Sequence, residues 1–200
     1  MSERGQDDIG SVTPGPYGAQ GAGVALSSVA IAGAWNVQGD PGRSSFVAGI
    51  EQAFGVALPL VPNTTVRSNA MVALWLGPRS WLLVESSPRV LLHADFDTKR
   101  DAVNAFGGAL FDVSASRVAY RVRGPLAGIV LAKSCPLDFE GESFGVGGCA
   151  QSVFGHVNAL LYREDAVPTY LLLVARSFAA DVWRTLCRSS AQYGYDVVAP

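Results

Sequence analysis

The run LAKSCPLDF, residues 131–139, contains the cysteine with the most suggestive neighbours in the chain. Cys135 lies two residues after Lys133 and three before Asp138, and a nucleophilic cysteine needs a nearby base or cation that stabilises its thiolate. The apolar spacing before it predicts a helix that ends at Pro136, so that the helix dipole disfavours a thiolate and Lys133 complements the terminal carbonyl groups. We therefore predict that Cys135 is not catalytic.

Metal binding is the next chemistry to consider, because the chain has three cysteines and two histidines. A zinc site needs about four such ligands, usually in close pairs. The candidate ligands are far apart in the sequence and form no close pair; they are Cys135, Cys149, His156 and Cys187. His93 has no other candidate ligand near it in the sequence. We expect no metal site, and we expect His156 to be an ordinary hydrogen-bonded histidine at a strand junction.

Carboxylates alternate along an acidic loop at Asp138, Glu140 and Glu142. Closely held carboxylates can bind a cation or serve as an acid and base pair. No further ligand is expected nearby, which favours a solvated loop.

The glycine-rich run at 145–149 lacks the third glycine of a dinucleotide-binding motif, and no phosphate-binding loop occurs elsewhere. We expect no cofactor in this chain.

Three arginines share one side of a predicted strand at residues 117–123, and apolar side chains take the other side. The arginines are Arg117, Arg121 and Arg123. They can hold an anionic ligand or the acidic surface of a partner, because guanidinium groups pair well with carboxylates. The alternative is a strand side that simply faces solvent. We name these three residues as candidate partner contacts.

The elements that position these residues follow from apolar spacing and turn residues. We predict four helices: one from after Asp40-Pro41-Gly42 to Gly55, one over 99–106, one from 126 to Pro136, and one that begins after a capping Ser177. In the last helix, the residues expected to face inward are Phe178, Val182, Trp183 and Leu186. We predict strands over 71–76, 81–85, 110–114, 117–123, 157–163 and 169–175, with a turn at 77–80. The run TYLLLVA at 169–175 is apolar enough for a central strand buried on both faces.

This order has too many adjacent strands for a doubly wound parallel sheet, and it predicts an α+β fold of two ferredoxin-like β/α subdomains packed together. Residues 1–23 contain six glycines and two prolines among polar residues, which predicts a flexible N-terminal arm. Residues 24–200 are expected to form a single α+β domain of two intimately packed subdomains.

Composition limits the possible partners. Of the 200 residues 49% are hydrophobic and only 16% are charged, an apolar excess that favours burial against another protein. A formal net charge of −2 gives no field that would attract nucleic acid. No stretch is long and apolar enough to be a membrane span, and no secretory signal is evident. Three cysteines without a CxxC pair suit a reducing cytoplasm.

Several short motifs together resemble the gamma subunit family of heterotetrameric sarcosine oxidase, a relative of the folate-binding aminomethyltransferase fold. The likeness covers about residues 33–188 and consists of Gly39-Asp40-Pro41, Leu58-Pro59 with Pro62-Asn63, Leu76-Gly77-Pro78, Trp81-Leu82-Leu83, Asp112-Val113-Ser114, Gly124-Pro125, Cys135-Pro136-Leu137-Asp138 and Gly155-His156. The turn after Gly77-Pro78 often carries acidic residues in this family, whereas this chain has Arg79-Ser80. That departure affects the substrate more than the fold.

The resemblance implies a complex that oxidatively demethylates sarcosine, or a similar N-methyl amine, to glycine and hydrogen peroxide, with tetrahydrofolate as the one-carbon acceptor. It implies alpha, beta and delta subunits as partners, and it places FAD, FMN, NAD, zinc and tetrahydrofolate in those subunits. The gamma chain is then a subunit without catalytic residues of its own. Two alternatives stay open: a freestanding folate-dependent aminomethyltransferase-like enzyme with Asp112 or Asp138 as acid and base, and a homo-oligomeric scaffold.

Overall fold

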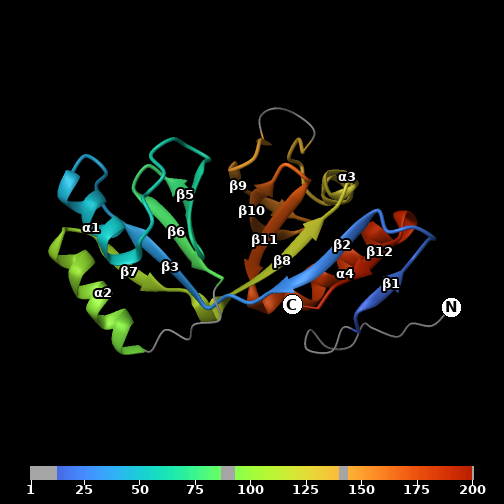
Figure 1. Cartoon of the computed structure of the whole chain (residues 1–200), viewed down its shortest axis with the longest axis horizontal. Helices are drawn as coiled ribbons and strands as arrows, with labels where there is room; N and C mark the ends of the chain where they lie inside the picture. Colours follow the sequence, from blue (N-terminus) through green and yellow to red (C-terminus); the bar gives the residue numbers. More distant parts are fainter. Residues whose placement is uncertain (1–12, 87–92, 140–143, 200) are drawn as a thin grey trace. The chain divides into compact units, whose positions relative to one another are not determined.

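The structure is a computed structural model that describes residues 13–86, 93–139 and 144–199. The chain divides into two compact units. Unit 1 comprises residues 1–29, 118–146 and 151–200, and unit 2 comprises 30–117 and 147–150. Each unit is built on its own β-sheet (Figure 1). The α+β class predicted from the sequence is confirmed, whereas the ferredoxin-like character of the subdomains and the proposed domain boundaries stay predictions.

Unit 2 contains a five-stranded sheet in the order β4-β5-β6-β3-β7. Its strands are β3 (Gly33–Gln38), β4 (Thr65–Ser68), β5 (Met71–Gly77), β6 (Ser80–Glu85) and β7 (Ala109–Asp112), and its helices are α1 (Ser44–Phe54) and α2 (His93–Ala105). The pairs β4–β5, β5–β6, β6–β3 and β3–β7 are all antiparallel. The β5–β6 hairpin and α1 confirm the sequence predictions, while α2 begins six residues earlier than expected.

One side of this sheet packs against the two helices. Phe46 and Ile50 of α1 are fully buried among sheet residues such as Trp81, whose ring centroid lies 6.0 Å from that of Phe46. Gly55 ends α1 in the left-handed conformation with φ 70°, and its N–H donates to the carbonyl of Glu51. The predicted amphipathic helix therefore forms, because its apolar stripe has a sheet face to cover and its C-cap is a glycine.

Unit 1 contains a seven-stranded sheet in the order β1-β12-β2-β8-β11-β10-β9. Its strands are β1 (Gly15–Tyr17), β2 (Val24–Val29), β8 (Arg117–Arg123), β9 (Cys149–Phe154), β10 (Val157–Asp165), β11 (Thr169–Ala175) and β12 (Tyr195–Val197), and its helices are α3 (Ala127–Ala132) and α4 (Ala179–Ser190). β11 is central, with six of its seven residues buried. This confirms the interpretation of TYLLLVA.

The helices α3 and α4 cover one side of the seven-stranded sheet. The Tyr120 hydroxyl of β8 donates to the carbonyl of Ala179 at 2.9 Å, and its ring lies 5.3 Å from that of Trp183 in α4. The Lys133 ammonium, just after α3, donates to the carbonyl of Ser189 at 2.7 Å. This lysine thus binds the C-terminal end of α4 rather than the carbonyl groups of its own helix.

Part of the predicted flexible arm is a strand. β1 pairs antiparallel with β12, and β12 pairs parallel with β2. Residues 1–12 of the arm lie outside the described residues. The N–H of Ala19 donates to the carbonyl of Ala191, and the N–H of Gly23 donates to that of Gly194, at 2.9 and 3.0 Å. The glycine-rich segment is ordered because the C-terminal strand offers it backbone hydrogen bonds, a pairing that composition does not reveal.

The final helix begins differently from the prediction. A 3-10 turn over Arg176–Phe178 precedes α4, and no side chain, including that of Ser177, caps the helix. Phe178 is 39% exposed instead of facing inward, whereas Val182, Trp183 and Leu186 are buried as expected. Residues in a 3-10 turn are wound more tightly than those in an α-helix. The side chain of Phe178 therefore does not lie on the inward-facing side that α-helical spacing predicts for it.

Candidate partner-binding surface

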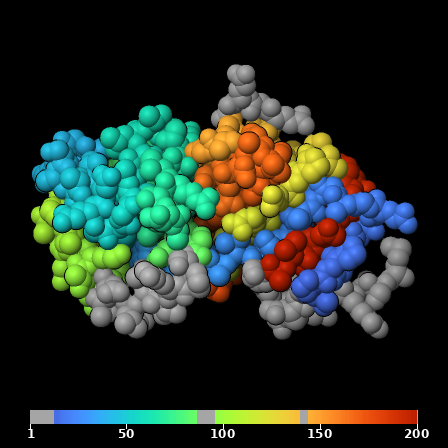
Figure 2. Space-filling model, viewed as in Figure 1, coloured from blue at the N-terminus to red at the C-terminus, as the bar shows by residue number. Residues whose placement is uncertain are grey.

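The arginine side of β8 is the surface that the sequence singled out. β8 lies between β2 and β11, and its residues Arg123 and Arg121 stand directly opposite Ala25 and Ser27 of β2. Tyr120 points to the side covered by α3 and α4, so Arg121 and Arg123 point to the other side. Figure 2 shows β2 in blue and β8 in yellow next to each other on the surface that faces the viewer.

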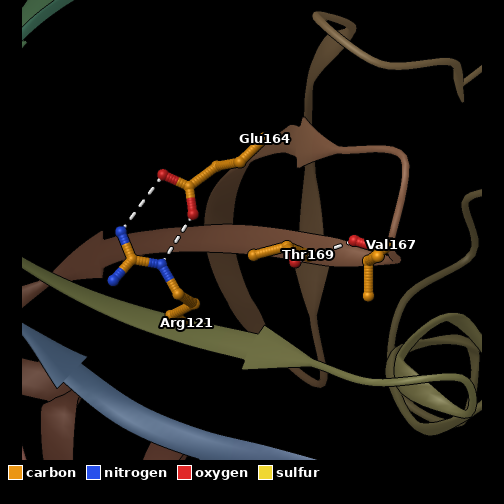
Figure 3. A network of polar contacts seen from close by, with 4 residues as sticks. All are labelled: Arg121, Glu164, Val167 and Thr169. Atoms are coloured by element: carbon orange, nitrogen blue, oxygen red, sulfur yellow. Dashed lines mark hydrogen bonds and ion pairs between the residues drawn. The ribbon is translucent and has the colours of Figure 1, made fainter.

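Arg121 is already paired within the chain. Its Nε donates to Oε2 of Glu164 in β10 at 2.6 Å, and its Nη2 donates to Oε1 at 3.2 Å (Figure 3). The Arg121 side chain is 36% exposed and that of Glu164 only 12%. The hydrogen bond that Arg121 donates to Glu164 raises the pKa of Arg121, although burial opposes this effect. The charge of Arg121 is therefore largely compensated by the protein itself.

Arg123 is the exposed cation of this surface. Its side chain has no hydrogen bond or ion pair within the part of the chain that the structure describes, and it stands beside the small residue Ala25. Arg117, at the start of β8, is partly buried. On the far side of β2, Asp196 of β12 is in register with Ala25. The surface therefore carries a positive charge on Arg123 and a negative charge on Asp196. Arg123 is the group best placed to donate hydrogen bonds to a carboxylate of a partner protein.

The structure does not bring Cys135, Lys133 and Asp138 together as a reactive group. Cys135 is 3% exposed, and its Sγ lies 3.7 Å from the hydroxyl of Ser152. Lys133 places its ammonium on the carbonyl of Ser189 and 4.4 Å from the ring centroid of Tyr193. Asp138 is exposed. Burial of the thiol and the use of the lysine elsewhere both disfavour nucleophilic chemistry at this position.

Of the other two thiols, Cys149 is buried and Cys187 is partly buried. Cys149 lies with its Sγ 3.3 Å from the carbonyl oxygen of Thr64 and 3.6 Å from that of Trp75. Burial raises the pKa of Cys149 to about 11, against a smaller opposing effect of the Trp75 carbonyl contact. Burial likewise raises the pKa of Cys187. All three cysteines are free of disulfide bonds, and the raised pKa makes Cys149 and Cys187 weak nucleophiles at neutral pH.

The remaining sequence candidates are dispersed. His156 is exposed in the turn between β9 and β10, with its ring 6.2 Å from that of Phe178. Asp112 accepts from the hydroxyl of Ser114 at 2.5 Å, which makes it a local turn residue. Glu140, Glu142 and the side chain of His93 lie outside the described residues. Among the described side chains, no three His, Cys, Asp or Glu residues come close enough to hold a metal ion.

A hollow of about 430 Å³ lies beside β1 and β12 and is lined by Tyr17, Tyr195, Asp196 and the loop 18–22. The two tyrosine rings are stacked with centroids 5.4 Å apart. Burial is the main cause that raises the pKa of Tyr195, so its phenol keeps its proton. The lining offers one carboxylate, that of Asp196, and the neighbouring Cys187 thiol, which hydrogen-bonds with Tyr195, has a pKa raised by burial.

Fold and surface together define an α+β protein with two sheets, one of which carries the exposed Arg123 on β8. None of the described helices is both long and apolar enough to cross a bilayer. Residues 38–192 match the sarcosine oxidase, gamma subunit family. The chain therefore belongs to this family, as its short motifs indicated.

Individual relatives agree with this assignment. The chain is 32% identical over 178 residues to the sarcosine oxidase subunit gamma of Corynebacterium sp. (strain U-96), covering 88% of this chain and 83% of the relative. It is 30% identical over 159 residues to that of Arthrobacter sp., covering 78% and 74%. A chain in the solved heterotetrameric sarcosine oxidase from Corynebacterium sp. U-96, in complex with pyrrole 2-carboxylate, matches with a TM-score of 0.76 and 28% identity, covering 88% of each chain.

Glu164 is the functional neighbour that sequence reasoning missed. It lies 43 residues from Arg121 in the chain, and no local pattern links the two. A sequence signal was nevertheless present, since Glu164 is the middle one of three charged residues, 163–165, that follow the apolar run 159–162 in β10. Such a residue needs a partner when the strand is buried.

Proposed function

We propose that this chain is the non-catalytic gamma subunit of a sarcosine oxidase-type complex. The complex oxidatively demethylates sarcosine, or a similar N-methyl amine, to glycine and hydrogen peroxide, with tetrahydrofolate as the one-carbon acceptor. The observation that carries this proposal is the match of residues 38–192 to the gamma subunit family. The solved relative with the same fold is part of a heterotetrameric oxidase, which supports assembly with alpha, beta and delta subunits.

The proposal assigns the chemistry to the partners. FAD, FMN, NAD, zinc and tetrahydrofolate belong to the other subunits. This chain contributes a surface that contacts those subunits. Burial of Cys135 and Cys149, the raised pKa of Cys149, and the dispersed carboxylates among the described residues support that division of roles. The three free cysteines support a reducing, cytoplasmic location, since exported proteins tend to oxidise such thiols.

Co-expression with the three other subunits tests the proposal. A tag on this chain should co-purify a complex with flavin absorbance that consumes oxygen when sarcosine is added. Recovery of this chain alone, without flavoprotein, would overturn the proposal. Calorimetric titration of the isolated chain with tetrahydrofolate tests the freestanding enzyme, because binding heat together with transfer of a one-carbon unit would contradict a non-catalytic role.

Arg123 is the β8 arginine that we expect to matter most for assembly, since Arg121 is neutralised by Glu164. Arg123→Glu should weaken association of this chain with the other subunits, and the loss should shrink as salt is added. Arg188→Glu is the matched control, because Arg188 is exposed on α4, the helix that covers the opposite side of the same sheet. Equal effects of both substitutions would show that net charge, and not this surface, is responsible.

A further inference from the structure

We infer that the exposed run Leu60-Val61-Pro62, called here the apolar loop, is an anchor that inserts into an uncharged, apolar depression on another subunit of the oxidase. The loop joins α1 to β4 in unit 2 (Figure 1). This inference rests on the proposed function, because it requires that the chain assembles with other subunits. It concerns a surface in unit 2 that is distinct from the arginines of β8.

The exposure of the loop is unusual for its residue types. Leu60 is 57% exposed and Val61 is 64% exposed, and they are adjacent in the chain. The neighbouring apolar residues behave differently, since Val56 and Leu58 are 1% and 4% exposed in the core of unit 2. Two consecutive aliphatic side chains that are exposed to solvent beside a well-packed core indicate a contact site.

The loop is held in place rather than free. At its start, the indole N–H of the buried Trp81 donates to the carbonyl of Pro59 at 2.8 Å. Within it, the hydroxyl of Thr64 donates to the carbonyl of Val61 at 2.7 Å. At its end, the N–H of Cys149 donates to the carbonyl of Asn63 at 2.9 Å. A loop held at three carbonyl groups loses little conformational entropy on binding, which is what an anchor requires.

The chemistry of the occupant follows from the charge pattern. No charged residue or histidine occurs between Glu51 and Arg67, so the loop offers an acidic or basic partner nothing to pair with. An apolar depression without buried charges is the complementary surface. Leu60 and Val61 alone expose far less than the roughly 800 Å² per partner that a stable interface buries. They therefore act as an anchor inside a larger interface with another subunit and do not suffice to pair two copies of this chain.

Dilution of the purified four-subunit complex, followed by mass photometry, tests this inference. Val61→Asp is compared with Val198→Asp, a matched change at a valine that is 49% exposed at the end of β12 in unit 1. Burying a largely exposed aliphatic side chain favours binding by roughly 1–2 kcal/mol, so Val61→Asp should raise the concentration at which the complex dissociates by about 5- to 30-fold. Val198→Asp should change it by less than threefold.

A second variant separates binding from folding. Val61→Thr keeps the β-branched shape and should raise the dissociation concentration by about three- to tenfold, with an unchanged thermal transition of the isolated chain. If the wild-type chain never assembles, the proposed function fails. If the wild-type complex assembles and Val61→Asp dissociates at the same concentration, only the anchor is refuted. Val61-dependent self-association of the isolated chain would also overturn it, since the occupant would then be a second copy.

Discussion

Replacement of Gly194 by alanine should detach the N-terminal segment from the seven-stranded sheet. Gly194 has φ 72° and ψ 142°, a conformation that L-residues rarely adopt. A Cβ atom there would lie 1.6 Å from the carbonyl oxygen of Gly21 and 2.4 Å from that of Ala19. Both contacts are with backbone atoms, so the segment that contains Ala19 and Gly21 has to move.

The cost has two sources. Forcing an alanine into this conformation costs roughly 1–3 kcal/mol. The displaced segment also loses the hydrogen bond from Gly23 to Gly194 and the one from Ala19 to Ala191, each worth about 0.5–1.5 kcal/mol. We expect a loss of about 2–6 kcal/mol in the local stability of residues 13–23, which largely abolishes the ordered state of this segment.

Hydrogen exchange read residue by residue is the appropriate assay, because the amides of Ala19 and Gly23 report the two bonds directly. Both should exchange at least tenfold faster in Gly194→Ala. The control is Gly55→Ala, since Gly55 has φ 70° and no atom within 4 Å of the added Cβ. It should cost about 1–2 kcal/mol in α1 and leave the N-terminal amides unchanged. Protection of Ala19 and Gly23 at the wild-type level in Gly194→Ala would refute the reasoning.

Three further predictions concern the thiols and the ion pair between Arg121 and Glu164. Burial raises the pKa of Cys149 from 9.0 to about 11, so the thiol loses its proton at lower pH in the unfolded chain than in the folded one. The free energy of unfolding therefore falls as the pH rises between these values. Cys149→Ala should reduce that fall by up to about 2–3 kcal/mol in urea titrations from pH 8 to 11. Cys135→Ser should keep sarcosine turnover of the assembled complex within twofold, and a tenfold loss in an intact complex would show that the thiol is needed. Glu164→Gln removes the negative charge that pairs with Arg121, a side chain that is 36% exposed, and should cost about 1 kcal/mol in urea denaturation. An equal cost in 1 M salt would contradict an electrostatic origin.

Elements with strong local signals were predictable. The helix that Gly55 ends, the hairpin of β5 and β6 and the buried strand β11 all occur where the sequence places them. Each has a complete pattern within about a dozen residues, namely an apolar stripe with a glycine cap, two apolar runs around a turn, or a continuous apolar run. The short strands β1 and β12 have no such pattern, since three residues are too few to show a period.

The candidate surface was predictable only in part. The alternation along β8 correctly separates Arg121 and Arg123 from Tyr120, because strand periodicity is a local property. The roles of the two arginines differ for a nonlocal reason, since Glu164 reaches Arg121 from β10 and Arg123 stands beside an alanine. Which arginine stays available could not be read from their spacing.

The sequence by itself determined the α+β class, the family and the absence of a local pattern for catalysis, because these depend on residue order and short motifs. Tertiary structure alone decided which groups meet. It paired Arg121 with Glu164, placed the ammonium of Lys133 on the end of α4, and ordered the glycine-rich segment on the C-terminal strand. The physical reason is that hydrogen bonds and ion pairs depend on distances in space, which chain folding sets between residues far apart in the sequence.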